Sequence, residues 1–410
     1  MKLAKLSLAA IVVAGLASSS FAADSLEGAF KEGKVSGQVQ AYYFDRDKAT
    51  SEGSIFSTGL DLSYETGLFY GFGMKATFQS SASPFADADG KTMYNSSMWG
   101  SGAQLSEIYL SYTMGKTTAL VGRMYLDTPL IASSGSRLNK QAFEGAAVIN
   151  TDLPNTTLIA GYVQKYQART DGNGNFGKFT KTFGTGSGYP FNLNVEGDVD
   201  LEDGAYTLAA INKSIAGLTL TAAYANAIDA IAIYYAEASY EGKAANFTYG
   251  LAAQYYYNDL DHAALGKGDI DLYGIKATVG VGAFTFTAAY TESGKADGNL
   301  DGVVSGLGGG ADLAYTMSPL NSDSYGADTK AYKIGAAYAV TTNANLGVSY
   351  TVNKMDSAAA TADEKTFLAF EGDYAFEGAL KGLSLSAIYE DQGKDANGQN
   401  EMWLKAIYKF

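Results

Sequence analysis

The last ten residues of the chain, 401–410, alternate between apolar and polar side chains. Successive side chains of a β-strand point to opposite faces, so one face here is apolar: Met402, Leu404, Ala406, Tyr408 and Phe410. The other face carries the charges of Glu401, Lys405 and Lys409. A soluble sheet seldom exposes such an edge, because its unpaired backbone promotes aggregation. In a closed membrane barrel the last strand pairs with the first and its apolar face meets lipid. The segment favours a membrane barrel over the alternative, the final strand of a soluble β-sandwich.

The first 22 residues have the pattern of a secretory signal peptide. Lys2 and Lys5 precede the apolar stretch 6–16, and Ser20-Phe21-Ala22 offers small residues at the positions that a signal peptidase requires. We expect residues 1–22 to be removed and residues 23–410 to form a single outer-membrane barrel domain; an uncleaved anchor is the alternative. No other segment approaches the run of about 20 apolar residues that a membrane-spanning helix needs.

The rest of the chain alternates with a period of two, as β-strands do. Examples are 247–257, 284–290 and 346–352, where Phe, Tyr, Leu and Val alternate with Thr, Ser, Gly and Asn. Short turns are expected at 65–67, 113–116, 152–155, 214–217, 241–245, 280–282, 341–345 and 377–382. Longer polar segments lie between them at 45–53, 80–103, 126–141, 166–203, 258–269, 292–329, 354–365 and 391–400, and only the connection near 226–229 breaks the alternation.

This sorting of connections by length predicts the fold. It is typical of an all-β, transmembrane, antiparallel up-and-down barrel with short periplasmic turns and long outer loops. The segments number about 18 strands, with 16 as the alternative. Barrels of 16–18 strands leave an aqueous channel, whereas about 8 strands leave a filled interior. The length therefore favours a water-filled channel for passive diffusion of small hydrophilic solutes and ions over a structural or adhesive barrel with a closed lumen.

Composition excludes several other functions. The chain has no Cys and one His, His262, in a segment expected to be an outer loop, so it lacks the base and nucleophile pairs of most hydrolases and the clusters that bind transition metals. We expect no enzyme activity and no cofactor. The formal net charge of −14 argues against nucleic acid as a partner.

Residues 119–148 carry a distinctive series of short motifs. They contain Gly122-Arg123, Thr128-Pro129-Leu130, Ser136-Arg137-Leu138 and Gln141-Ala142-Phe143-Glu144-Gly145. This segment resembles the OprD-type substrate-selective porins of the bacterial outer membrane, whose fold is an 18-stranded barrel. The signal peptide and the Leu-Lys-Ala-Ile-Tyr-Lys-Phe ending are similar to the major porins of Campylobacter and related bacteria. The low arginine content and Gly135, where Asp is common, mean that a preference for basic amino acids does not follow from the resemblance.

The resemblance also implies site residues and partners. In porins the third long loop, here 126–141, folds inward and narrows the pore, which makes Asp127, Arg137, Asn139, Lys140 and Glu144 the candidate constriction residues. The alternative is that they only pack the loop against the wall. The terminal Phe410 corresponds to the aromatic residue that the barrel assembly machinery recognises. A homotrimer is also compatible with the sequence, because lipid-facing and subunit-facing bands are both apolar.

Strand phase assigns further charges to the lumen. The expected basic residues are Lys75, Arg123, Lys276, Lys333 and Lys405. The expected acidic residues are Asp61, Glu107, Glu371, Asp373, Glu390 and Glu401. Charge in a water-filled pore sets selectivity. A basic row opposite an acidic row would produce a transverse field, and scattered solvated charge is the alternative.

Two long outer segments are acidic. One holds Glu196, Asp198, Asp200, Glu202 and Asp203, and the other holds Asp259, Asp261 and Asp269. Clustered carboxylates can hold Ca²⁺, or divalent ions can bridge them to lipopolysaccharide; simple solvated loops are the alternative. The same acidity predicts a mild preference for cations. The sequence does not name the transported solute.

Overall fold

The computed structural model describes residues 23–48, 50–184, 198–200, 202–263, 266–298, 300–321, 324–355, 363–393 and 398–410. The predicted signal peptide, 1–22, lies outside these residues.

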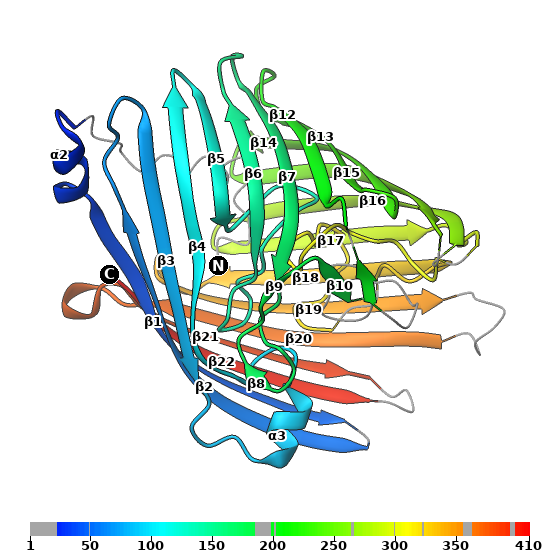
Figure 1. The fold of residues 1–410 in the computed structure, drawn as a ribbon. Coiled ribbons are helices and arrows are strands. Elements are labelled where there is room, and N and C mark those ends of the chain that lie inside the picture. Colours follow the sequence, from blue (N-terminus) through cyan, green and yellow to red (C-terminus); the bar gives the residue numbers. More distant parts are fainter. Residues whose placement is uncertain are drawn as a thin grey trace.

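Within the described residues, 18 antiparallel strands form one closed sheet, which confirms the predicted barrel and its strand number (Figure 1). In chain order they are β1 (Lys34–Lys48), β2 (Ser51–Glu65), β3 (Phe72–Ala82), β4 (Gly100–Met114), β5 (Thr117–Met124), β6 (Ala142–Asn150), β7 (Thr156–Gln167), β12 (Ala205–Asn212), β13 (Leu218–Ala227), β14 (Ile231–Ala244), β15 (Phe247–His262), β16 (Gly266–Val281), β17 (Phe284–Ser293), β18 (Thr329–Ala339), β19 (Ala344–Met355), β20 (Asp363–Ala375), β21 (Leu383–Gln392) and β22 (Gln399–Lys409).

Smaller helices and strands lie at the two ends of the barrel. Helix α2 (Leu26–Lys31) begins at the N-cap Ser25, and α3 (Ala88–Met93) begins at the N-cap Asp87; each cap accepts a backbone N–H of its helix. The remaining elements are β8 (Gly174–Asn175), β9 (Phe179–Thr180), β10 (Thr182–Gly184), β11 (Asp198–Asp200) and the 3₁₀ turn η1 (Gly378–Leu380). No helix among the described residues is long and apolar enough to cross a bilayer.

The first and last strands close the sheet. β1 pairs with β2 on one side and with β22 on the other, in a register that runs from Gln38 opposite Lys409 to Lys48 opposite Gln399. The backbones of Gly37 and Phe410 exchange hydrogen bonds of 3.0 and 3.1 Å at the end of this seam. The C-terminal strand is therefore paired on both sides, as the alternation of residues 401–410 predicts.

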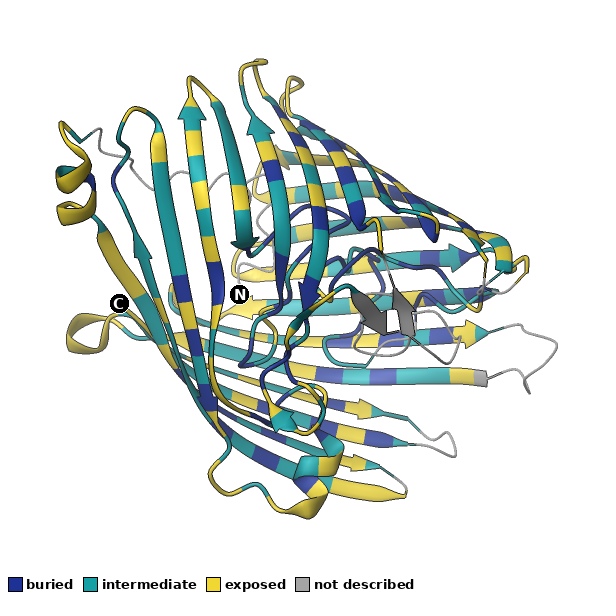
Figure 2. Ribbon diagram, viewed as in Figure 1, coloured by how far each residue is buried: buried dark blue, intermediate teal, exposed yellow. Residues whose placement is uncertain are grey.

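The two faces of each strand differ in burial (Figure 2). Leu404, Tyr408 and Phe410 are exposed on the outer face of the terminal segment, while Trp403 on the opposite face is buried. Tyrosines follow one another around the outer face: Tyr224 lies 4.8 Å from Tyr234, ring centroid to centroid, and Tyr234 lies 6.0 Å from Tyr257. Such rings mark the membrane interface of a barrel.

Two of the predicted long loops are in fact strands. β1 and β2 remain paired up to Lys48 and Ser51, and β15 and β16 remain paired up to His262 and Gly266. The polar segments 45–53 and 258–269 thus belong largely to paired strands. In 258–269 the buried Asn258 and Leu260 alternate with the exposed Asp259 and Asp261. Their sequences lack an apolar alternation, so periodicity alone could not identify them as strands.

A buried aromatic pair joins the two seam strands on the inner face. The rings of Phe44 and Trp403 stack with their centroids 4.5 Å apart and their planes at 4°. Replacing a buried Phe by Ala removes about 3–5 kcal/mol of stability, so Phe44→Ala should lower the free energy of unfolding by that amount. Equilibrium urea unfolding in lipid vesicles, followed by circular dichroism, measures this. Val39→Ala, on the outer face of the same strand where Val39 is 50% exposed, should lose far less; equal losses would contradict the assignment of faces.

Candidate functional site

The segment between β5 and β6, residues 125–141, crosses the interior of the barrel. At one end, Lys140 is held against β3: its N–H donates to Gln79 Oε1 at 2.7 Å and its carbonyl accepts from Gln79 Nε2 at 3.0 Å. Four residues earlier, Lys405 Nζ of β22 donates to the Ser136 carbonyl at 2.7 Å. We name residues 125–141 the crossing loop, because its contacts join walls that are several strands apart.

Arg137 occupies the centre of the crossing loop. Its guanidinium carbon lies 3.8 Å from the ring centroid of Trp403 and 5.6 Å from that of Phe44. A cation over an aromatic face is attracted by the quadrupole of the ring. Burial and the neighbouring Arg169 lower the pKa of Arg137 to about 9, and the guanidinium stays charged at neutral pH. Its Nε has no hydrogen-bond partner among the described residues.

Arg169 joins Arg137 from a different loop, the one that follows β7. Its side chain is only 8% exposed, and burial lowers its pKa. Arg169 Nη2 donates to Ser136 Oγ at 3.4 Å, and the Arg169 carbonyl accepts from Asn139 Nδ2 at 3.3 Å. Its Nε also has no partner among the described residues. Arg137, Arg169 and Lys405 are called the cationic cluster below.

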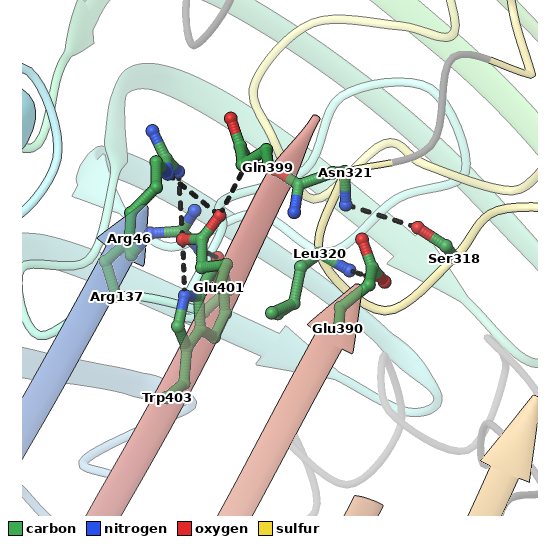
Figure 3. Close-up of polar contacts among 10 residues, drawn as sticks. Arg46, Arg137, Ser318, Leu320, Asn321, Glu390, Gln399, Glu401 and Trp403 are labelled. Carbon is green, nitrogen blue, oxygen red and sulfur yellow. Dashed lines mark hydrogen bonds and ion pairs between the residues drawn. The ribbon is translucent and has the colours of Figure 1, made fainter. Parts of the chain in front are cut away.

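One carboxylate lies beside this cluster, and its hydrogen-bonding capacity is already used (Figure 3). Glu401 accepts two bonds of 2.9 Å from Arg46, one of 2.6 Å from Trp403 Nε1 and one of 3.2 Å from Gln399 Nε2. The bidentate pair with Arg46 is the strong form of an Arg–carboxylate contact. Glu401 therefore fixes Trp403 under Arg137, and Arg46 offsets its negative charge, which leaves the cationic cluster with a positive excess.

A second long segment, residues 294–328 between β17 and β18, also enters the interior, as the yellow trace in Figure 1 shows. It meets the crossing loop where the Leu307 N–H donates to the Leu130 carbonyl at 2.8 Å and the Ala132 N–H donates to the Leu307 carbonyl at 2.9 Å. It reaches β21, three strands along the wall from β18, where the Leu320 N–H donates to Glu390 Oε2 at 3.1 Å (Figure 3). The two loops brace each other across the lumen.

The other predicted residues of the crossing loop have mixed surroundings. The Lys140 ammonium lies 4.1 Å from the Tyr125 ring centroid, and burial lowers its pKa. Burial raises the pKa of Asp127, which forms an isolated bridge with Ala132. Asn139 is buried and holds the Arg169 backbone. Arg137 and Asn139 thus belong to the arrangement around the cationic cluster, whereas Asp127 and Lys140 lie nearer the loop's base.

The predictions for Arg123 and Glu144 are wrong. Both lie on the outer face: Arg123 pairs across the sheet with Ile108, which is 42% exposed, and Glu144 pairs with Arg123. Arg123 shares its face with Val121, which is 57% exposed, and Glu144 follows the buried Phe143 in regular alternation. The lumen prediction for Arg123 took the wrong phase of β5, and the constriction role that the resemblance implied for Glu144 does not hold. Glu144 therefore contributes nothing to a constriction, and Arg123 does not face the lumen.

The remaining predicted wall charges lie on the inner face but do not form two opposed rows. Lys75 pairs with Glu107 at 3.0 Å, and Asp61 accepts from Gln38 at 2.7 Å. Lys333 donates to the Met317 carbonyl at 2.6 Å, Lys276 lies 4.2 Å from the Tyr315 ring centroid, and Asp373 accepts from Asn345 at 2.9 Å. Glu371 lies in the field of Lys333. Asp61, Lys75 and Glu107 on β2 to β4 are mixed in sign. Lys276 and Lys333 lie on β16 and β18, and the acidic Glu371, Asp373, Glu390 and Glu401 follow on β20 to β22, so the basic group borders the acidic group along the wall.

Sequence reasoning missed two important residues. Arg169 was hidden in a long polar segment with no motif of its own, and Arg46 lay in a segment taken as loop. Trp403 could have been found, because it shares the inward phase of Glu401 and Lys405 in the terminal strand. Among the described residues no group of His, Asp and Glu is arranged to hold a metal ion, and the calcium prediction that involves Glu196 lies partly outside those residues.

The anchoring of the crossing loop by Gln79 yields a test. Gln79→Ala removes both bonds to the Lys140 backbone and leaves buried polar groups unsatisfied, which costs about 1–3 kcal/mol per group. We expect a loosened loop, seen as increased current noise and brief closures in single-channel recordings from planar bilayers. Gln38→Ala, which alters a wall glutamine bonded to Asp61, is the control and should leave the noise unchanged. A quiet Gln79→Ala channel would show that this anchor is dispensable.

Comparisons with known proteins agree with the fold. No curated protein matches the chain. Among solved structures, OccAB2 of Acinetobacter baumannii is similar with a TM-score of 0.79 at 19% identity, covering 93% of this chain and 99% of that one. OpdK of Pseudomonas aeruginosa, solved with vanillate, has a TM-score of 0.75 at 17% identity, covering 93% and 100%. These likenesses show the fold.

A family model described as outer membrane porin, OprD family, matches residues 97–402. The chain therefore belongs to the OprD family of porins, channels for small solutes in the bacterial outer membrane.

Proposed function

We propose that this porin selects small solutes that carry a carboxylate, and that the crossing loop forms its constriction. The observation that carries this proposal is the cationic cluster: three positive side chains from two loops and one wall strand gather where the loop crosses the interior. Charged groups at the narrow part of a water-filled pore set its selectivity. Guanidinium groups in addition match a carboxylate with two parallel hydrogen bonds.

Two features of the cluster support a role in solute recognition rather than in packing alone. The Nε groups of Arg137 and Arg169 are buried and have no partner among the described residues, and a buried unsatisfied donor is costly. Burial also lowers the pKa of both arginines, and the neighbouring Arg169 adds to this effect for Arg137. A carboxylate passing the cluster would relieve both costs, because it supplies acceptors and negative charge together.

The relative OpdK supports the same class of solute. It was solved with vanillate, a small aromatic carboxylate. The cation preference predicted from the acidic outer loops acts at a different depth: of those carboxylates, Asp259, Asp261 and Asp269 lie at the end of the β15–β16 hairpin, whereas the cluster lies at the crossing loop. We propose that the constriction decides the selectivity, since every solute must pass it.

The proposal also covers the partners of the barrel. Phe410 closes the seam with Gly37 and has an exposed ring, which suits recognition by the barrel assembly machinery. The apolar outer band suits either lipid or the neighbouring subunits of a homotrimer, and divalent cations, Ca²⁺ among them, would bridge acidic outer loops to lipopolysaccharide. Crosslinking in native membranes distinguishes a trimer from a monomer.

Ion selectivity tests the constriction. In a salt gradient across a planar bilayer, Arg137→Gln and Arg169→Gln should each shift the reversal potential toward cations. Two unit charges about 4 Å apart in water interact by about 1 kcal/mol, so each substitution should lower the permeability to a monovalent anion by about fivefold and raise that to a monovalent cation. The matched control is Arg123→Gln, which removes the same charge from the outer face and should change nothing. Unaltered selectivity in both variants would indicate that these arginines only pack the loop.

Solute block tests the carboxylate preference separately. Benzoate added to one side should reduce the potassium chloride current of the native channel at concentrations where benzamide, its neutral isostere, has no effect. The double variant Arg137→Gln/Arg169→Gln should lose this difference. Equal block by benzoate and benzamide in the native channel would contradict a carboxylate-selective constriction while leaving the porin assignment intact.

A further inference from the structure

Three charged side chains lie together on the outer face of the barrel, on the adjacent strands β5, β6 and β7. Glu144 accepts from Arg123 Nε at 2.9 Å through Oε2 and from Lys165 Nζ at 2.6 Å through Oε1. All three side chains keep solvent access, 34% for each cation and 26% for Glu144. We call Arg123, Glu144 and Lys165 the outer charged triad. Its net charge is positive, because two cations share one carboxylate.

The strand irregularity is what turns Lys165 outward. Val163 on β7 is buried, and Tyr162 is exposed. In a regular strand Lys165 would share the inward face of Val163, since alternate residues lie on one face. The pairing shifts from Gly145 opposite Val163 to Glu144 opposite Lys165, which leaves Gln164 as the extra residue. Such a bulge redirects the side chains beyond it, and here it brings Lys165 to Glu144.

The triad lies at the outer interface of the membrane. Tyr162 is exposed on the outer face, and its hydroxyl donates to the Asp203 carbonyl, at the end of the long outer loop that precedes β12, at 2.9 Å. Lys165 comes after Tyr162 on the same strand and is therefore nearer to the end of the barrel that carries that loop. A cation facing lipid costs about 2–4 kcal/mol at the midplane but only about 0–1 kcal/mol near the interface. The triad is therefore tolerated at a depth where lipid headgroups begin.

The cations of the triad retain donors for a ligand. Among the described residues, the contacts of Arg123 are Glu144, through Nε alone, and the Phe179 ring, whose centroid is 4.3 Å from the guanidinium carbon. Lys165 contacts Glu144 with one of its three N–H groups. The ring of Phe179 covers one face of the guanidinium group. The two terminal nitrogens, at the edge of the group, remain available to a ligand. That edge matches the paired oxygens of a phosphate.

We infer that the outer charged triad binds a phosphate group of a lipid in the outer leaflet, with Arg123 and Lys165 as the donors. Glu144 positions the two cations and competes with the phosphate for them. The lipid source follows from the position of the triad: it faces outward, beyond an interfacial tyrosine, on a barrel of the bacterial outer membrane. A free phosphate ion would reach this face only from the headgroup layer, where lipid phosphates already stand at high local concentration.

The test measures lipid retention by the full barrel in detergent, with native mass spectrometry and bisphosphorylated lipid A as the probe. Arg123→Gln/Lys165→Gln should bind lipid A at least about tenfold more weakly, as expected from the loss of charge-assisted bonds. Glu144→Gln should bind it more tightly than the native protein, because the competing carboxylate is gone. A triad that served only to stabilise the sheet would give no such gain. Dephosphorylated lipid A should bind the native protein and the double variant equally.

Controls separate the site from general charge effects. Lys116→Ala/Lys381→Ala removes two exposed cations from periplasmic turns and should leave lipid A binding unchanged. Folding of every variant is checked by heat-modifiable migration on a gel, and single substitutions of Arg123 and Lys165 serve if the double variant does not fold. Native-like binding by the folded Arg123 and Lys165 variants, or no gain in Glu144→Gln, would overturn the inference. Displacement of lipid A by millimolar inorganic phosphate would assign the site to free phosphate instead.

Discussion

Closure of the sheet between β1 and β22 is the constraint on which the rest of the molecule depends. In lipid every backbone N–H and C=O must find a partner within the protein, and a barrel meets this need only when its last strand pairs with its first. Here that pairing runs from Gln38 opposite Lys409 to Lys48 opposite Gln399. The same seam carries Phe44 and Trp403 on its inner face, so the element that closes the barrel also provides the surface on which Arg137 lies.

The interior is organised by loops, which use the space that eighteen strands enclose. The crossing loop and residues 294–328 contact each other through Leu130, Ala132 and Leu307, and each is tied to the wall by buried polar bonds. Such satisfied networks hold a unique arrangement. The positive side chains are thereby held in place although two of them belong to loops. The positive charge at the crossing loop is therefore fixed by the fold.

Much of the fold could be predicted from the sequence. The short turns and the outward residues of the terminal strand follow from a period of two, because lipid on one side and water on the other impose alternation. The paired strand ends at 45–53 and 258–269 could not be predicted, since their sequences lack an apolar alternation even where one face is buried, as at Asn258 and Leu260. Arg123 was assigned the wrong phase of β5, where alternation with the exposed Val121 places it outward. The constriction role of Glu144 rested on a resemblance to a constriction loop, but Glu144 lies in strand β6.

The same distinction between what the sequence and the tertiary structure determine applies to the candidate site. The sequence by itself determined the barrel and which apolar residues face outward, because these depend on local alternation. It also determined which loop enters the barrel, because motifs within 119–148 mark that loop. Only the tertiary structure decided that Arg169 and Lys405 join Arg137, since these residues are far apart in the chain and meet through contacts across the lumen. It also decided that Lys165 faces outward, because a bulge at Gln164 reverses the alternation of β7 in a way that the sequence pattern does not reveal.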